Sequence, residues 1–229
     1  MECNATITHI FSETPDTKTF RLRPEYPFAF QPGQFIMVTA SLGEEKVTRA
    51  FSISSAPGQE HMDITIKAEP TGHFSKFANE YFRVGDVMKV KGPYGYFTFT
   101  EQEQGDLLFI AAGSGISPFR SILQYIFEKH LPHAVTLLFS NKTEADIIFR
   151  KELETYAQHF PQFRFFPIVT REDSWDGHKS RVDTAFLQQH IHNDTLCYLC
   201  GPPLMVEDVK QQLLQLGVQE GRIKTEKYG

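Results

Sequence analysis

The sequence is poor in cysteine and tryptophan and has no long apolar run. Its 229 residues include three cysteines and one tryptophan. No run approaches the roughly 20 apolar residues of a membrane-spanning helix, so we expect no membrane span. The net charge of −5 offers no broad positive surface and excludes nucleic acid as an expected partner. The first residues lack the pattern of a secretory signal, which predicts a cytoplasmic protein.

The few cysteines predict neither a cluster nor a metal site. Cys197 and Cys200 form a C-x-x-C, but they lie in the apolar segment 195–200, which is typical of a buried strand. Residues three apart on a strand point to opposite faces, so the two thiols should diverge. With Cys3 they are also too few for a four-cysteine iron–sulfur cluster. The nine histidines show no ligand spacing, so we expect no metal.

The residues that are present form two patterns. Up to residue 103 the apolar segments are short, and turn signals such as Gln31-Pro32-Gly33 separate them. One helix is expected at 73–82, where apolar residues recur at helical spacing. These features predict a small antiparallel barrel. Its expected strands are Thr17–Leu22, Gln34–Thr39, Arg49–Ser54, Met62–Lys67 and Val87–Lys91.

From residue 104 continuous apolar runs alternate with helical segments. Helices are expected at 119–127 and 206–216, the second ended by Gly217. This alternation predicts an α/β domain with a parallel sheet covered on both faces. We place the boundary in the polar stretch 101–105, giving domains 1–103 and 104–229. The expected strands are Leu107–Ala112, Val135–Ser140, Arg164–Thr170 and Thr195–Cys200.

Two strand ends in the second part carry the strongest local signals. Segment 111–118 (AAGSGISP) follows a strand and opens a helix, with Ser117 expected as N-cap and Pro118 in the first turn. Its glycines and free N–H groups suit a phosphate. Segment 200–203 (CGPP) is a second such corner, from which Cys200 should face the crevice. Ligands collect at strand carboxyl ends, so the two corners predict two walls of one pocket.

The first part offers complementary chemistry in the segment 49–52 (RAFS). Arg49 suits a phosphate, Phe51 a flat ring, and the hydroxyl of Ser52 a ring nitrogen. Segment 71–75 (TGHFS) opens the helix and offers a second anion site at a helix N-terminus.

Taken in order, these segments resemble the ferredoxin–NADP reductase superfamily. The matching motifs are R-x-[YF]-S, G-x-x-S, G-P-x-G-x-F, G-x-G-x-x-P and C-G-P-P, and they cover almost the whole chain. The resemblance implies an FAD-binding antiparallel Greek-key β-barrel followed by a Rossmann-like NAD(P)-binding α/β domain. The sequence stops at Gly229 without a fused ferredoxin or globin, which is typical of a stand-alone core module.

The resemblance also implies residue roles. It assigns FAD to Arg49, Ala50, Phe51, Ser52, Ile66, Lys67, Ala68, Gly72, His73, Phe74 and Ser75. It assigns the nicotinamide cofactor to Gly113, Ser114, Gly115, Pro118, Cys200, Gly201 and Pro202. Of the catalytic candidates, Ser52 would approach flavin N5 and Cys200 the nicotinamide ring. Glu226, with Tyr228, would approach the flavin from the C-terminus. Phe51 replaces a commoner tyrosine, so stacking is retained without the hydroxyl.

The dinucleotide preference rests on the ends of two strands. An acidic residue after the second strand would favour NAD, but segment 140–142 (SNK) has none before Glu144. Thr170, Arg171 and Arg181 lie where some NADPH-using relatives place their contacts, although NADH-using relatives carry similar arginines. We therefore expect NADPH in preference to NADH.

The implied function is transfer of hydride from NAD(P)H to bound FAD, with onward passage of electrons. A ferredoxin, a flavodoxin, an oxygenase component or a small acceptor would receive them. Two alternatives stay open at this point. One is an FAD-binding electron-transfer subunit with little activity alone, and the other is a nucleotide-binding module without flavin.

Overall fold

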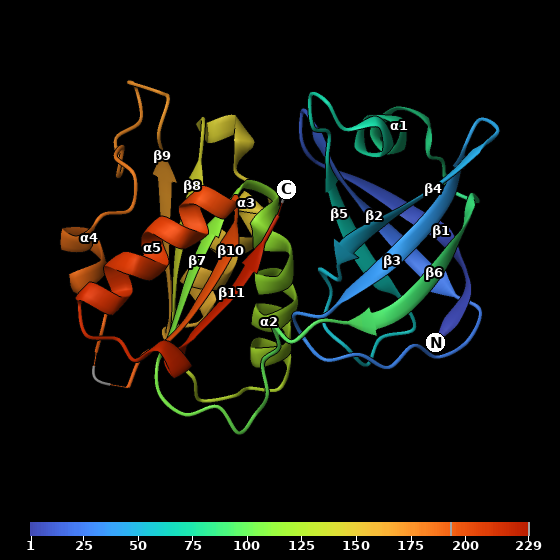
Figure 1. The fold of residues 1–229 in the computed structure, drawn as a ribbon. Coiled ribbons are helices and arrows are strands. Elements are labelled where there is room, and N and C mark those ends of the chain that lie inside the picture. Colours follow the sequence, from blue (N-terminus) through green and yellow to red (C-terminus); the bar gives the residue numbers. More distant parts are fainter. Residues whose placement is uncertain (193, 229) are drawn as a thin grey trace. The chain divides into compact units, whose positions relative to one another are not determined.

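The computed structural model describes residues 1–192 and 194–228. The chain divides into two compact units (Figure 1). The first comprises Met1–Thr100 with Ser117–Glu128, and the second comprises Glu101–Ile116 with Lys129–Gly229. The first unit is built on an antiparallel sheet and the second on a parallel one, which confirms the predicted fold class.

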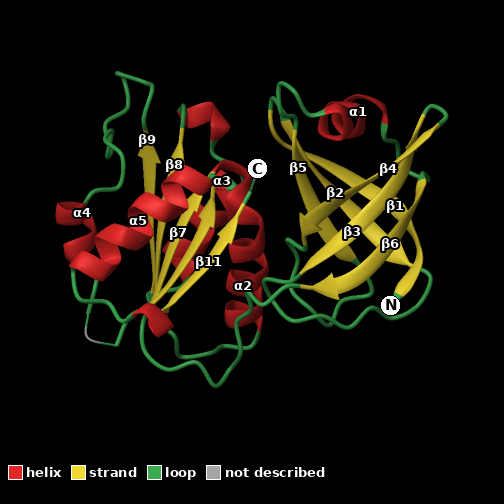
Figure 2. Cartoon of the chain, viewed as in Figure 1, coloured by secondary structure: helices red, strands yellow, loops and turns green. Residues whose placement is uncertain are grey.

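Six antiparallel strands form one curled sheet in the first unit (Figure 2). Their order in the sheet is β4-β3-β6-β1-β2-β5. A bridge between Ile53, just after β4, and Ile64 on β5 joins the two outer strands. The curled sheet is therefore drawn together at this end of its two outer strands. The strands are β1 (Glu2–Thr14), β2 (Thr17–Pro24), β3 (Phe35–Leu42), β4 (Glu45–Ser52), β5 (Met62–Lys67) and β6 (Val87–Tyr94).

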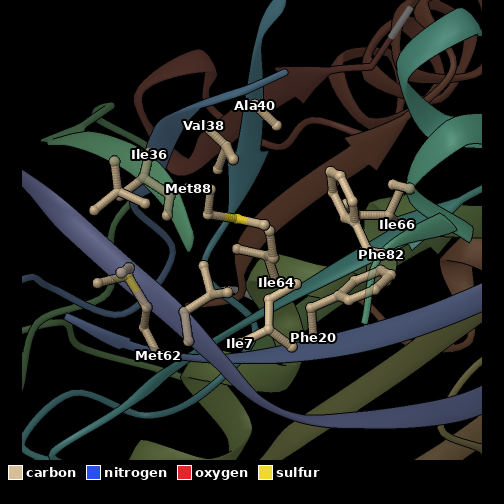
Figure 3. Close-up of a cluster of buried hydrophobic side chains, with 14 of the residues drawn as sticks. Ile7, Phe20, Ile36, Val38, Ala40, Met62, Ile64, Ile66, Phe82 and Met88 are labelled. Atoms are coloured by element: carbon tan, nitrogen blue, oxygen red, sulfur yellow. The ribbon is translucent and has the colours of Figure 1, made fainter. Parts of the chain in front are cut away.

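Alternate residues of these strands fill the interior of the barrel (Figure 3). Ile7, Phe20 and Ile64 are fully buried there. Helix α1 (His73–Tyr81) adds Phe74 and Ala78 to the same cluster. Burial of each large side chain contributes roughly 1.5–3 kcal/mol, so this cluster is the main source of the unit's stability.

Helix α2 (Ser117–Glu128) packs with the barrel, although it follows the first strand of the second unit in the chain. Phe119 meets Phe97 edge-on with ring centroids 5.7 Å apart, and Tyr125 meets Phe99 at 6.4 Å. The predicted domain boundary at 103/104 assigns this helix to the second domain by sequence and stays a prediction.

Five parallel strands form the sheet of the second unit in the order β11-β10-β7-β8-β9. They are β7 (Leu107–Ala112), β8 (Val135–Asn141), β9 (Phe163–Val169), β10 (Leu196–Gly201) and β11 (Ile223–Lys227). The helices are α3 (Arg150–His159), α4 (Thr184–Gln188) and α5 (Pro203–Gln215). Helix α5 packs on the sheet through Val206, Val209 and Leu213, and Gly217, with φ +87°, follows its end as predicted.

Four elements were not predicted, because their apolar signals are weak. Strand β1 buries Cys3, Ala5 and Ile7 at alternate positions, but the first two are small. Strand β11 has the composition IKTEK and lies at the edge of its sheet. Helix α3 buries only Leu153 among its described side chains, and α4 has five residues. Such segments depend on tertiary packing that a local pattern does not encode.

The three cysteines are free and buried. Cys197 and Cys200 lie on the buried strand β10, as predicted. Burial raises the pKa of the Cys197 thiol to about 12, so it stays protonated and unreactive at neutral pH. Among residues 1–192 and 194–228, no helix is long and apolar enough to cross a membrane.

Two glycines with similar backbone angles allow a matched test of packing in the barrel. Gly33 has φ +95°, and an added Cβ would overlap the carbonyl oxygen of Phe97. Gly58 has φ +91°, but its Cβ would meet nothing within 4 Å. We expect Gly33→Ala to lower the free energy of unfolding by about 3 kcal/mol or more, and Gly58→Ala to lower it by about 1 kcal/mol. Urea unfolding measures both, and equal costs would contradict the close contact.

Candidate functional site

The order of the parallel strands reverses at β7. Strand β8, the next in sequence, pairs with one side of β7, and β10 pairs with the other. The connections that leave the carboxyl ends of β7 and β10 therefore run in opposite directions from a topological switch point. Ligands of open parallel sheets bind at such points.

The corners after β7 and β10 are in backbone contact. A Cβ on Gly115 would overlap the carbonyl of Cys200 and lie 2.9 Å from the Cα of Gly201. Gly201, with φ +156°, has the Met205 methyl 2.6 Å and the Ala112 Cβ 3.1 Å from the position of its own missing Cβ. Only glycine fits at either position. The two segments that the sequence singled out thus pack against each other, with Gly115, Cys200 and Gly201 buried at their contact.

The start of the helix after β7 differs from the prediction. A 3-10 turn over Gly113–Ile116 precedes α2, so Ser117 is the first α-helical residue and not its N-cap. Pro118 is buried in the first turn of α2. Gly113, with φ +54°, permits the chain to turn directly from the strand into the 3-10 turn. The N–H groups nearest the strand end therefore belong to the 3-10 turn. Pro118 is the second residue of α2.

Cys200 does not face an open crevice, contrary to the prediction. Its side chain is 0% exposed and hydrogen-bonded to that of Tyr228, whose backbone N–H donates to the Gly201 carbonyl over 2.9 Å. Strand β11 places Glu226 beside Cys200 in the parallel register. Burial, and then the charge of Glu226, raises the pKa of the Cys200 thiol well above its ordinary value. The thiol is therefore neutral and can serve as a packing or hydrogen-bonding group but not as a base.

The ends of β8 and β9 are joined by their backbones. The Thr170 N–H and hydroxyl both donate to the Asn141 carbonyl, at 3.0 and 3.1 Å, and the Arg171 N–H donates to the Lys142 carbonyl at 2.8 Å. The side chains of Lys142, Arg171 and Arg181 are exposed. Three cations thus lie on the segments that leave this part of the sheet edge.

The first acidic residue after β8 is already paired. Glu144 forms a salt bridge with Arg150, which also binds Glu154 at 2.7 Å. Its backbone N–H donates to Glu172 at 2.7 Å. Glu144 is therefore held by its own neighbours, which makes it a poor acceptor for a ribose hydroxyl pair.

In the barrel, segment 49–52 presents a cation, a ring and a hydroxyl in sequence. Arg49 is exposed, and its guanidinium donates one bond, of 2.8 Å, to the Thr48 carbonyl. The Phe51 ring is half-buried and packs against Phe74 with centroids 5.4 Å apart. Ser52 is 5% exposed. Phe51 is therefore partly accessible, and Arg49 on the same strand is exposed.

The loop before α1 is closed by its own hydrogen bonds. The Ser75 hydroxyl accepts from the Glu69 N–H at 3.1 Å and donates to the Gly72 carbonyl at 3.2 Å. A Cβ on Gly72 would overlap that hydroxyl, so the loop requires glycine. The helix has no side-chain N-cap and no acid in its first turn. Phe74 is 2% exposed, so its ring belongs to the core, whereas the neighbouring His73 is exposed.

The backbone of segment 66–68 is already engaged. The Asn79 amide donates to the Ile66 carbonyl at 3.0 Å, and the Ala68 N–H donates to the Asp16 carbonyl at 2.7 Å. The Lys67 ammonium binds the Asp16 carboxylate at 2.8 Å. Sequence analysis missed Asp16 and Asn79, since both lie among polar residues with no motif. They fix the segment, and a ligand there would have to share the second lone pair of a carbonyl.

These groups fit an FAD. An uncapped helix N-terminus and a loop without room for a side chain suit a pyrophosphate, and an accessible ring beside a cation suits the flavin end. The glycine corners after β7 and β10 likewise fit a dinucleotide, because they let backbone N–H groups approach its phosphates.

Comparison with known proteins agrees with this interpretation of the two units. Residues 4–99 match the family described as an oxidoreductase FAD-binding domain, and residues 109–211 match an oxidoreductase NAD-binding domain. The FAD/NAD-binding domain of a nitric oxide dioxygenase from Vibrio cholerae superposes with a TM-score of 0.90 at 26% identity. The match covers 99% of this chain and 98% of that one.

Curated relatives are similar along nearly the whole chain. The glycine betaine monooxygenase reductase subunit of Chromohalobacter salexigens is 29% identical over 99% of this chain and 64% of its own length. The reductase component of the naphthalene 1,2-dioxygenase/salicylate 5-hydroxylase systems of a Ralstonia species is 27% identical over 97% of this chain and 68% of its own length. The chain thus spans about two thirds of the length of these relatives. With both domain families matched in order, it belongs to the ferredoxin–NADP reductase superfamily.

Proposed function

We propose that the chain is an NAD(P)H-dependent, FAD-containing reductase that delivers electrons to an oxygenase component or a ferredoxin-type carrier. The observation that carries the proposal is the pairing of two sites in one chain. The barrel offers a cation, an accessible ring and an uncapped helix N-terminus, and the parallel sheet offers two glycine corners at its switch point. Relatives named as reductase or electron-transfer components of oxygenase systems support the acceptor class.

The protein's residues have to bind and orient two cofactors rather than move protons. Arg49 and the N-terminus of α1 would hold the FAD pyrophosphate, and Phe51 would pack against the flavin or its ribityl chain. The nearly buried hydroxyl of Ser52 would bond to the ring nitrogen N5. When bound, FAD supplies the hydride-accepting ring and the capacity to release electrons singly.

The second unit would bind the nicotinamide cofactor at its glycine corners. Gly113, Ser114 and Gly115 would bind the phosphates through the 3-10 turn, and Gly201 and Pro202 would shape the floor below the nicotinamide. Cys200 stays protonated at neutral pH because of its raised pKa. It would therefore support the backbone of this corner as a neutral packing group and exchange no proton at neutral pH.

The central test is anaerobic mixing of the FAD-loaded protein with NADPH and, separately, with NADH. We expect fast loss of the yellow flavin absorbance with at least one of them. Gly115→Ala should retain FAD but slow this bleaching by about a hundredfold, because its Cβ would displace the corner by an ångström or so. Gly221→Ala, whose Cβ meets nothing within 4 Å, is the matched control. Firmly bound FAD that neither nucleotide bleaches would refute the reductase and favour an electron-transfer subunit.

NADPH is the dinucleotide that we propose. Glu144 is held by Arg150, while Thr170, Arg171 and Arg181 lie on the segments that leave the sheet edge. The double substitution Arg171→Gln, Arg181→Gln should raise the Kd for NADPH about tenfold, the equivalent of about 1.4 kcal/mol, and leave that for NADH nearly unchanged.

Arg164→Gln serves as the control for this pair, since Arg164 is an exposed arginine near the opposite end of β9. Equal weakening of both dinucleotides would mean that the two arginines do not recognise the 2′-phosphate. An unchanged NADPH affinity in the double variant would also show that the two arginines do not recognise the 2′-phosphate.

Arg49 should contribute a charge-assisted bond to the FAD pyrophosphate. Arg49→Gln is expected to weaken FAD binding about tenfold to a hundredfold, because such bonds contribute about 1.5–3 kcal/mol. Lys46→Gln removes an exposed cation from the same strand β4 and should leave FAD affinity unchanged. Titration of the apoprotein with FAD measures both. Loss of affinity in both variants alike would indicate a general electrostatic effect and contradict a specific contact.

A further inference from the structure

A carboxylate is buried between two guanidinium groups in the first unit. The Asp63 side chain is 1% exposed and binds Arg21 in a bidentate pair of 2.9 and 3.1 Å. Arg120, on α2, donates to the same carboxylate at 3.3 Å and to the Ser54 carbonyl at 3.0 Å. The His61 ring lies 3.9 Å from Asp63 on its outer side. This cluster links β2, β5 and α2.

Two more side chains of α2 bind the segment that follows β4. The Ser121 hydroxyl donates to the Ser55 carbonyl at 2.6 Å, and the Gln124 amide oxygen accepts from the Ala56 N–H at 3.0 Å. The Ser55 hydroxyl in turn accepts from the Asp63 N–H at 3.0 Å. One face of α2 therefore meets three successive backbone positions, 54–56, with directional hydrogen bonds.

Stability alone gives little reason for this arrangement. A buried ion cluster loses hydration that its internal attraction roughly repays, and apolar residues of the same volume commonly stabilise as much or more. The aromatic contacts of Phe119 and Tyr125 already supply apolar packing, but such contacts tolerate small rotations. Charged, bidentate hydrogen bonds fix direction as well as distance. The cluster is thus suited to hold α2 in one orientation.

The chain connects this cluster to both proposed cofactor sites. Helix α2 follows directly from the 3-10 turn Gly113–Ile116, the proposed phosphate-binding corner. Ser54 lies two residues after Ser52, which we assign to flavin N5. The match to the NAD-binding family, residues 109–211, includes α2, yet the helix packs with the barrel. In sequence, α2 is therefore part of the nucleotide-binding family match. In the structure, it packs with the strands of the first unit.

We propose that Asp63 and Arg120 are positioning residues for hydride transfer. They fix the orientation of α2, the helix that continues directly from the 3-10 turn Gly113–Ile116. This inference rests on the proposed reductase function, because it concerns the helix that begins at the proposed dinucleotide-binding turn. Hydride transfer depends steeply on donor–acceptor geometry, so loss of the cluster should slow the reduction step while both cofactors still bind.

The test compares four variants of the full chain, loaded with FAD. Arg120→Gln removes the charge on α2, and Arg120→Lys keeps it with fewer donors. Asp63→Asn removes the negative charge that Arg21 and Arg120 share. It tests whether the effect comes from the ion cluster and not from Arg120 alone. The control is Arg23→Gln, which removes an arginine that is 65% exposed and pairs at 2.9 Å with Glu60. For each variant we would measure three quantities. These are amide hydrogen exchange over residues 117–128, the Kd values for FAD and dinucleotide, and the rate of flavin reduction at saturating dinucleotide.

We expect Arg120→Gln and Asp63→Asn to speed exchange over 117–128 and to slow flavin reduction about tenfold or more, with both Kd values within about twofold of wild type. Arg120→Lys should recover part of the rate, and Arg23→Gln should match wild type. If Arg120→Gln matches Arg23→Gln in exchange and rate, the proposal is wrong. It is equally wrong if exchange rises throughout the chain and FAD is lost, since that marks a merely structural cluster.

Failure of the reductase function itself gives a different result. In that case neither dinucleotide reduces the wild type or Arg23→Gln. The exchange measurement, which needs no dinucleotide, still decides whether the cluster fixes α2. Faster exchange confined to 117–128 in Arg120→Gln supports the fixed helix, and unchanged exchange overturns it.

Discussion

The carboxylate of Asp63, held between two guanidinium groups, anchors the polar contacts that α2 makes with the rest of the first unit. With that charge in place, Arg120 can lie against the Ser54 carbonyl without leaving an unpaired cation in a nearly buried position. The neighbouring bonds of Ser121 and Gln124 then follow along the same face of α2. In our proposal this converts a helix contributed by the nucleotide-binding segment into a fixed part of the barrel. A barrel held together by apolar contacts alone would bind a flavin equally well but would leave the helix free to rotate.

A second constraint acts at the sheet of the second unit. The corners after β7 and β10 touch through their backbones, and they can do so only because both contain glycine. This contact buries Gly115 and Gly201 and leaves the neighbouring thiol of Cys200 buried and protonated. The two corners themselves carry no ionisable side chain except the protonated Cys200, and Glu226 on the neighbouring strand β11 lies beside that thiol. Such a site suits a reaction whose chemistry is carried by the cofactors, and this accounts for the scarcity of ionisable groups at the switch point.

The sequence predicted most of the fold because the decisive segments have strong local signals. Continuous apolar runs identified β7 and β10, and glycines at their ends identified the two corners. Strands β1 and β11 were not predicted. In β1 the buried residues Cys3 and Ala5 are small, and β11 is largely charged. Cys200 was expected to face a crevice, but the hydrogen bond from Tyr228 depends on the pairing of β11 with β10, which spacing does not encode. The ion cluster was missed for the same reason. Asp63 lies between Met62 and Ile64 in the segment MDITIK, which was a usable signal, but its partners Arg21 and Arg120 are distant in the chain.

Central to the proposed mechanism is the direct passage of hydride from the dinucleotide to a flavin held in a fixed orientation. The most direct measurement is the anaerobic rate of flavin reduction with dinucleotide deuterated at C4, on one prochiral face and then on the other. A fixed orientation predicts that deuterium on one face slows reduction several-fold and that deuterium on the other leaves the rate nearly unchanged. Equal rates from both labelled forms, each the same as that of the unlabelled dinucleotide, would show that transfer of this hydrogen does not limit reduction. Equal slowing by both would contradict a fixed orientation outright.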